Sequence, residues 1–190
     1  QSATLVCHDW GGIIALSFAE AYPQKTENLV IFNRPHPRSR KREMALNNEQ
    51  KERSAYIARF TNSDGDLGGM DAERRAGSHQ GTVWYERYLA AYQRSDYEAM
   101  LNYYRAYYPK PPWMVDESPI VPLDVPVLEF HGLDDGAYVN ESLNNTWESM
   151  GRDFTLVTLP GIGHNSQNTG DIQFVTTMLR SWLEMQKSRQ

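Results

Sequence analysis

Asp9 is the residue of this sequence best placed for covalent chemistry. It follows a short apolar run, residues 4–7, and precedes an apolar segment with helical character. This order of strand, sharp turn and helix is typical of a nucleophile elbow, in which small residues, here Cys7 and Gly11, flank the nucleophile at two positions' distance. Glycine suits such a turn because the backbone is strained and the helix passes close to the strand.

A carboxylate at the elbow predicts a particular kind of reaction. Asp9 is charged at neutral pH and can attack carbon without a base to activate it. The bond it forms is an alkyl ester, which a second step must hydrolyse. This indicates displacement at an sp³ carbon, as in epoxides or alkyl halides, rather than ordinary ester or peptide hydrolysis. The alternative role for Asp9 is structural, as the N-cap of the following helix.

Further polar residues follow two later strands. Asp134 and Asp135 come after an apolar run at 125–131, and His164 follows another at 154–159. Ligands of open α/β sheets bind at the carboxyl ends of the strands. The chain order of nucleophile, acid and histidine is that of a hydrolytic triad on such a sheet. Either aspartate could orient the histidine, and each motif alone could be an ordinary turn.

The elements that must position these residues alternate between strands and helices. Apolar, β-favouring runs predict four strands, at 4–7, 28–33, 125–131 and 154–159. Helical periodicity predicts helices at 13–22, 143–150 and 171–185. Such βαβ units build a parallel sheet, so the predicted fold class is α/β. The first strand lacks polar alternation and is expected to be central, buried on both faces.

A polar, mostly helical segment separates the second and third predicted strands. Two prolines, Pro35 and Pro37, redirect the chain where it begins. Eight of the eleven tyrosines lie between Val83 and Trp113, where helical spacing favours a packing role for most of them. We predict a helical lid at 34–119, inserted in a core formed by 1–33 and 120–190.

Composition limits the classes of function. The 190 residues fit one domain with a lid, and a net charge of −5 gives no basic surface for nucleic acid. No apolar run approaches the ~20 residues of a membrane span, and no signal peptide is recognisable. The single cysteine, Cys7, allows no internal disulfide, which suits the cytoplasm. No His and Cys residues are grouped at metal-binding spacing.

The predicted first strand begins within a few residues of Gln1, and the sequence has no initiator methionine. A central parallel strand needs neighbours on both edges, which earlier βα units usually provide. We therefore expect N-terminal strands that this sequence lacks. An uncovered edge exposes backbone hydrogen-bonding groups and apolar side chains, so the chain alone is expected to associate through it.

Over nearly its whole length the chain resembles the epoxide hydrolases of the α/β-hydrolase fold. The resemblance is carried by the elbow His8-Asp9-Trp10-Gly11-Gly12 and by Asn33-x-Pro35-His36-Pro37, which opens the lid. The Gly-x-x-Asp spacing of the acid favours Asp135 over Asp134. The family's His-Gly-x-Pro loop, which supplies one oxyanion-hole amide, would lie upstream of this sequence, whereas the backbone N–H of Trp10 would supply the other.

Two lid tyrosines are also implied by the resemblance. Leu101-Asn102-Tyr103-Tyr104-Arg105 is similar to the family segment in which a tyrosine directly precedes an arginine, which places that tyrosine at Tyr104. Tyr56, in Tyr56-x-x-x-Phe60, is similar to the family's other lid tyrosine by a looser match. The chain departs from the family at Asn165, where a tryptophan often follows the catalytic histidine.

The resemblance implies a two-step reaction of an epoxide with water, without cofactor or metal. Tyr56 and Tyr104 would bind the epoxide oxygen while Asp9 attacks a ring carbon and forms an ester. His164, oriented by Asp135, would activate the water that releases a vicinal diol. A haloalkane or haloacid dehalogenase, which needs halide donors in place of the tyrosines, is one alternative. A non-catalytic remnant of the same fold is another.

Overall fold

The computed structural model describes residues 1–61, 71–169 and 171–189. These residues form two compact units. The core unit consists of Gln1–Arg53 and Trp113–Gln190, and the helical unit consists of Ser54–Pro112. The predicted lid at 34–119 thus extends beyond the helical unit, since residues 34–53 and 113–119 belong to the core unit. Residues 62–70 of that predicted lid lie outside the described residues.

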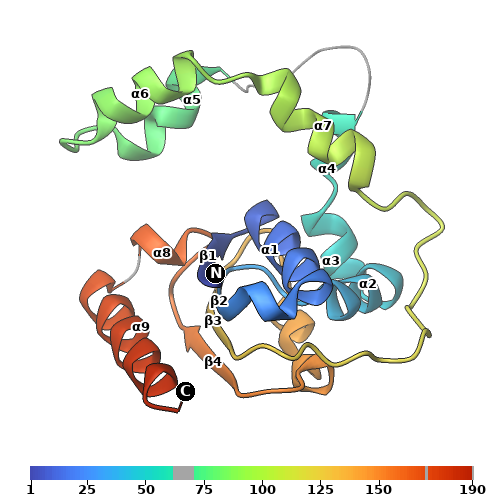
Figure 1. Ribbon diagram of the computed structural model, residues 1–190. Coiled ribbons are helices and arrows are strands. Elements are labelled where there is room, and N and C mark those ends of the chain that lie inside the picture. Colours follow the sequence, from blue (N-terminus) through green and yellow to red (C-terminus); the bar gives the residue numbers. More distant parts are fainter. Residues whose placement is uncertain (62–70, 170, 190) are drawn as a thin grey trace. The chain divides into compact units, whose positions relative to one another are not determined.

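Four parallel strands form the sheet of the core unit (Figure 1). Their bounds are β1 Ala3–His8, β2 Thr26–Phe32, β3 Val127–Gly132 and β4 Phe154–Leu159, and their spatial order is β1-β2-β3-β4. Each bound lies within a few residues of the predicted one. The predicted α/β class and parallel sheet are therefore confirmed.

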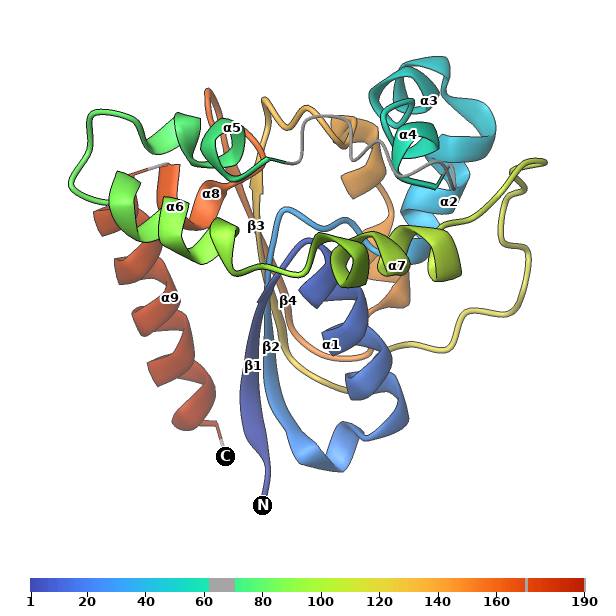
Figure 2. The ribbon, with the colours of Figure 1, turned by 90° about the horizontal axis from the view of Figure 1, so that it is seen from above.

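Two helices cover opposite faces of this sheet, as Figure 2 shows: α1 (Trp10–Ala21) on one face and α9 (Ile172–Lys187) on the other. Successive residues of β2 point to alternate faces. Leu29 and Ile31 belong to the hydrophobic cluster that includes Leu16 of α1. Val30 and Phe32 belong to the cluster that includes Trp182 of α9. Burial on both faces explains why residues 29–32 of β2 are all apolar.

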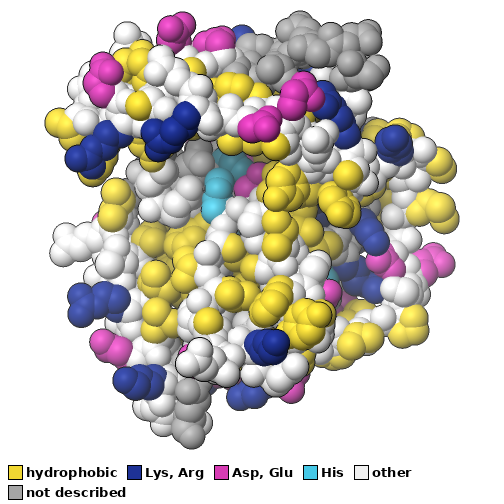
Figure 3. Space-filling model, turned by 45° about the horizontal axis from the view of Figure 1, so that its top comes forward, with side chains coloured by type: hydrophobic (Ala, Val, Ile, Leu, Met, Phe, Trp, Pro, Cys, Tyr) yellow, Lys and Arg dark blue, Asp and Glu magenta, His cyan; other side chains and the backbone are white. Residues whose placement is uncertain are grey.

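β1 lies at one edge of the described sheet, opposite β4, and it is less buried than β2 and β3. The exposed fractions of Val6 on this strand and of Ile14 and Phe18 on α1 are 57%, 51% and 38%. Hydrophobic side chains also gather on the face of the molecule drawn in Figure 3. The apolar run at residues 4–7 does form a strand. The sequence pattern predicted burial on both faces, but the described residues leave part of this strand exposed.

The remaining elements are short. In the core unit they are α2 Pro37–Leu46, α3 Asn48–Arg53, α8 Ser166–Thr169 and three 3₁₀ helices at Pro23–Lys25, Asn140–Leu143 and Thr146–Ser149. In the helical unit they are α4 Ile57–Thr61, α5 Ala72–Ala76, the 3₁₀ helix Gly77–His79, α6 Tyr85–Gln93 and α7 Tyr97–Tyr107. Among the described residues, no helix is long and apolar enough to cross a membrane.

The prediction of a helix at 143–150 is wrong. The chain there forms two separate 3₁₀ turns, and Asn145 between them has a φ of 63°. A left-handed residue interrupts an α-helix, and asparagine is among the few residues that adopt this conformation readily. The apolar spacing of the segment gave no sign of this interruption.

Candidate active site

Polar side chains from the carboxyl ends of all four strands meet at one edge of the sheet. Asp9 follows β1, and Asn33 and Arg34 follow β2. Asp135 and Tyr138 lie in the loop after β3, and His164 lies in the loop after β4. The predicted Asp9, Asp135 and His164 are thus brought together from positions up to 155 residues apart, and they are joined by side chains that sequence reasoning did not single out.

Asp9 occupies a strained turn between β1 and α1. Its φ of 47° and ψ of −116° lie outside the regions that L-residues favour, at a cost of about 1–3 kcal/mol. Its side chain makes no capping hydrogen bond to α1. The alternative role as an N-cap is therefore not supported. The Asp9 side chain instead contacts Tyr138 and Arg34.

The glycine that close packing requires is Gly12 rather than Gly11. A Cβ on Gly11 would lie 3.6 Å from the Cβ of Cys7, which is ordinary contact. A Cβ on Gly12 would lie 2.9 Å from both Cβ and Cγ of Arg34 and would displace that side chain. The small residue at position 12 thus determines where Arg34 can lie.

Three groups approach the same oxygen of Asp9, Oδ1. The Tyr138 hydroxyl donates a hydrogen bond to it at 2.8 Å, Arg34 Nη1 lies 3.5 Å away and His164 Nε2 lies 3.9 Å away. Among the described residues no hydrogen bond or ion pair reaches the other oxygen, Oδ2. Burial alone would raise the pKa of Asp9, but His164 and Arg34 outweigh that effect and hold it well below its usual range. Asp9 is therefore ionised at neutral pH.

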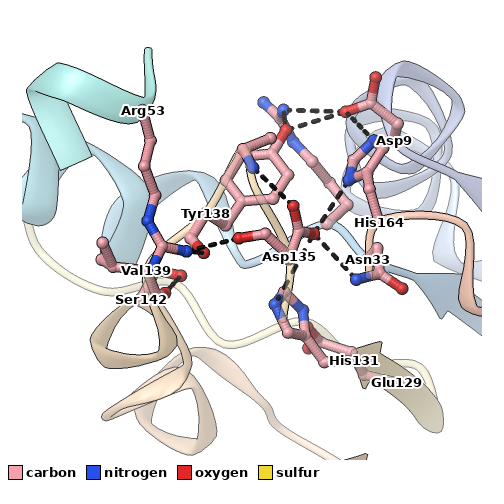
Figure 4. A network of polar contacts seen from close by, with 12 residues as sticks. Asp9, Asn33, Arg53, Glu129, His131, Asp135, Tyr138, Val139, Ser142 and His164 are labelled. Carbon is pink, nitrogen blue, oxygen red and sulfur yellow. Dashed lines mark hydrogen bonds and ion pairs between the residues drawn. The ribbon is translucent and has the colours of Figure 1, made fainter. Parts of the chain in front are cut away.

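His164 lies between two carboxylates, which Figure 4 shows on opposite sides of its ring. Its Nδ1 is 2.9 Å from Asp135 Oδ2, and its Nε2 faces Asp9. Burial lowers the pKa of His164, but the contacts with Asp135 and Asp9 outweigh it and raise the pKa to about 9. With both carboxylates ionised, the imidazole is therefore protonated at neutral pH.

Asp135, and not Asp134, contacts the histidine. Asp135 is fully buried, whereas Asp134 is exposed. The Asn33 side-chain amide donates to Asp135 Oδ2 at 2.8 Å, and the backbone N–H of Ala137 donates to Oδ1 at 2.7 Å. Burial raises the pKa of Asp135, but the contact with His164 and these donors lower it below its usual value. Both of its oxygens are thus occupied, and the carboxylate has a fixed orientation.

The loop that carries His164 is held by backbone contacts. His8 Nε2 donates to the backbone carbonyl of His164 at 2.9 Å. A Cβ at Gly132, the last residue of β3, would clash with the backbone oxygens of Ile162 and Gly163. Glycine is therefore required where β3 ends, because the histidine loop passes directly over it.

A second buried pair lies behind Asp135. Glu129 and His131 of β3 are 1% and 0% exposed, and His131 Nδ1 is 3.7 Å from Glu129 Oε1. His131 Nε2 is 4.0 Å from Asp135 Oδ2. Burial raises the pKa of Glu129, with His131 acting in the opposite direction. Among the described residues, no group of three or more His, Cys, Asp or Glu side chains could hold a metal ion.

The predicted lid tyrosines lie together within the helical unit. The ring centroids of Tyr56 and Tyr104 are 6.5 Å apart, and Phe60 packs against both at 5.3 and 5.0 Å. The helical unit thus brings its two predicted donors into one aromatic cluster, although 47 residues separate them in sequence.

Trp10 is the first residue of α1, where backbone N–H groups have no partner within the helix. Its oxyanion role stays a prediction.

Sequence and structure comparisons relate the chain to known hydrolases. No protein-family model matches the chain. It is 26% identical over 181 residues to Epoxide hydrolase 1 of Caenorhabditis elegans, covering 86% of this chain and 44% of the relative. An epoxide hydrolase found in metagenomes from hot environments superposes with a TM-score of 0.78 at 26% identity, covering 96% of this chain and 67% of the other.

A crystal structure of the Bacillus megaterium epoxide hydrolase in complex with an inhibitor also superposes with a TM-score of 0.78, at 24% identity. That match covers 96% of this chain and 69% of the other. The chain has an α/β-hydrolase fold. The resemblance to epoxide hydrolases is confirmed. The α/β-hydrolase chain described here spans less than half the length of the C. elegans relative.

Several residues of this α/β-hydrolase site were assigned no role from the sequence, although His8 and Asn33 stand in the motifs that carry the resemblance. Asn33, Arg34, Tyr138 and His8 all contact a predicted site residue or its backbone. Asn33 and Arg34 come directly after the end of β2, so the strand-end rule that selected His164 could have selected them too. Tyr138 has no such signal, because its contact with Asp9 joins two loops that are far apart in sequence.

Proposed function

We propose that this protein is an epoxide hydrolase that opens an epoxide to a vicinal diol through an ester on Asp9. The observation that supports it best is the pair of contacts made by His164, whose Nδ1 is 2.9 Å from Asp135 and whose Nε2 faces Asp9 at 3.9 Å. An ionised elbow carboxylate beside a histidine and its orienting acid suits alkylation followed by ester hydrolysis. A serine nucleophile would need the histidine already in the first step.

In the first step Oδ2 of Asp9 attacks a ring carbon. No described side chain occupies this oxygen, and the depressed pKa of Asp9 keeps it charged without a base. The ring C–O bond breaks, its electron pair goes to the epoxide oxygen, and that oxygen then takes a proton from water to become a hydroxyl group. An alkoxide leaves poorly unless donors stabilise its charge, and Tyr56 and Tyr104 would supply them. Their shared position in one aromatic cluster supports this paired role.

In the second step His164 acts as a base toward water. Two carboxylates raise its pKa in the free enzyme to about 9, so it begins protonated at neutral pH. Esterification removes the charge of Asp9 and with it one of the two interactions that favour the imidazolium. The pKa of His164 should therefore fall once the ester has formed, and the ring then releases its proton to solvent. Asp135 keeps the ring oriented, so Nε2 is directed at the water that attacks the ester.

The test uses the full-length protein with a panel of aromatic and aliphatic epoxides, and diols are detected by mass spectrometry. Matched alkyl halides in the same panel, with released halide measured, test the dehalogenase alternative. His164→Gln should form the ester but not hydrolyse it, so the peptide containing Asp9 should gain the mass of the epoxide. Label on a different residue, or halide release without any diol, would contradict the proposal.

A further inference from the structure

Two buried side chains without a role in the proposed mechanism converge on Oδ1 of Asp9. Tyr138 is 4% exposed and Arg34 is 7% exposed. The Tyr138 hydroxyl donates to Oδ1 at 2.8 Å, and Arg34 Nη1 lies 3.5 Å from the same oxygen. Arg34 Nη1 also donates to the Tyr138 hydroxyl oxygen. Both groups thus lie on one side of the Asp9 carboxylate and leave Oδ2 open.

We propose that Tyr138 and Arg34 form a side-chain oxyanion site for the second step of the reaction. In this inference, which rests on the proposed function, Oδ1 is the carbonyl oxygen of the Asp9 ester. When water adds to the ester, negative charge develops on that oxygen. Donors fixed in advance at such a position are a principal source of rate acceleration in acyl transfer. Tyr138 and Arg34 supplement any backbone amides at the elbow.

Both donors are chemically suited to this task. Burial, more than any other effect, raises the pKa of Tyr138 well above its ordinary value. The hydroxyl therefore keeps its proton and can donate it in a hydrogen bond. An arginine side chain keeps its charge in proteins. Neither group therefore loses its donor capacity at any pH at which the enzyme could work.

The two donors are also held in place. Arg34 lies over the rings of Trp10 and Tyr138, with its guanidinium carbon 5.8 and 5.3 Å from their centroids. Its Cβ and Cγ fill the space that a side chain on Gly12 would occupy. Tyr138 is held through its backbone carbonyl, which accepts a hydrogen bond from Arg53 Nη1 at 2.6 Å. Little rearrangement is needed when charge develops on Oδ1.

The electron pairs of the second step balance around this oxygen. His164 Nε2 takes a proton from water, the water oxygen bonds to Cγ of Asp9, and the C=O electron pair moves onto Oδ1. When that pair returns, the bond between Cγ and Oδ2 breaks, and the departing alkoxide takes the proton from His164. The diol leaves with the former Oδ2, and Asp9 keeps the oxygen of the water. The second proton of that water then leaves Asp9 for solvent, which restores the carboxylate.

The same donors should act in the opposite direction on the first step. That step consumes the negative charge of Asp9, and Tyr138 and Arg34 stabilise this charge before the reaction. Removing them makes the carboxylate more basic and no less able to attack. The proposal therefore predicts that the two steps respond differently to the same substitution, which a general loss of structure would not cause.

The deciding experiment is Tyr138→Phe in the full-length protein, with the rates of ester formation and ester hydrolysis measured by rapid mixing and mass spectrometry. Hydrolysis should slow by about 10²–10³-fold, the usual effect of losing one oxyanion donor. Ester formation should stay constant or accelerate, so the ester should accumulate at steady state. Tyr22→Phe, on the exposed end of α1, is the matched control and should change neither rate.

Arg34→Met provides a second variant, with thermal unfolding as the check that each protein folds. It should also slow hydrolysis more than ester formation. An unchanged ratio of the two rates in both folded variants would overturn the inference while leaving the proposed function intact. If instead the wild type makes no diol and His164→Gln gains no mass on Asp9, the proposed function itself has failed.

Discussion

The two aspartates that face His164 have opposite environments. Asp135 is fully buried, and both of its oxygens accept hydrogen bonds, from Asn33 and His164 on one side and from Ala137 on the other. The Asp9 side chain is 23% exposed, and all its described contacts go to Oδ1. One carboxylate is fixed at both oxygens, and the other is fixed at one.

This difference suits Asp135 to orienting the histidine and Asp9 to reacting with a substrate. A carboxylate whose two oxygens both accept hydrogen bonds can position a histidine, but neither of its oxygens is free to attack carbon. Asp9 keeps one oxygen open, and the same three groups that hold the other oxygen also keep it ionised. The turn around Asp9 is strained, whereas no positive φ occurs at Asp135. The environment of each carboxylate thus matches the role proposed for it.

The largest expected effect is that of Asp9→Ala, which removes the open oxygen altogether. Turnover of epoxides should fall by about 10⁴-fold or more, as for loss of a covalent nucleophile. Diol production by the purified full-length variant measures it, and far-ultraviolet circular dichroism checks that the sheet is intact. A variant that keeps a tenth of wild-type activity would show that Asp9 is not the attacking group.

Asp135→Asn is expected to have the next largest effect. The substitution keeps the size of the side chain but removes the charge that favours a correctly oriented His164, so ester hydrolysis should fall by about 10²–10⁴-fold. Asp134→Asn is the matched control, because Asp134 is exposed and its neighbour makes the contact. Equal loss of activity in the two variants would remove the distinction between the two aspartates.

The pH dependence of His164 tests both carboxylates together. Its pKa is raised in the folded protein to about 9, from an ordinary value of 6.5. The stabilisation from its charge is therefore complete below pH 6.5 and is lost as the pH rises through about 9. The excess unfolding free energy of wild type over His164→Gln should shrink across this window. In Asp9→Ala, an NMR titration of the His164 ring should give a lower pKa than in wild type.

The elements of the core were predictable because their signals are local. The apolar runs of β2 and β3 and the period of α9 reflect burial of those segments. The elbow pattern selected Asp9, and the strand-end rule selected His164 together with Asp134 or Asp135. The Gly-x-x-Asp spacing of the family resemblance then favoured Asp135. The predicted helix at 143–150 was wrong because a single left-handed Asn145 overrides apolar spacing.

The unpredicted part of the site depends on contacts that have no local pattern. Gly136-Ala137-Tyr138 is an ordinary turn in sequence, yet Tyr138 reaches a residue 129 positions away. The position of Arg34 depends on the absence of a side chain at Gly12. Sequence periodicity shows which residues are buried, but not which polar group a buried side chain meets.

The smallest catalytic effect is expected from the tyrosines of the helical unit, and it should fall on the opposite step from that of Tyr138. Tyr56→Phe and Tyr104→Phe should each lower the rate of ester formation on epoxides by roughly tenfold, because each removes one donor to the departing oxygen. Ester hydrolysis should be unaffected, since by then that oxygen is an alcohol.

Tyr92→Phe is the control, because Tyr92 packs against Tyr88 in the same unit, outside the cluster of Tyr56 and Tyr104. Equal effects of Tyr92→Phe and Tyr104→Phe would argue that these tyrosines only pack. A slower hydrolysis step in Tyr104→Phe would show that the donors are not divided between the two steps, with Tyr138 at the ester and the paired tyrosines at the leaving group.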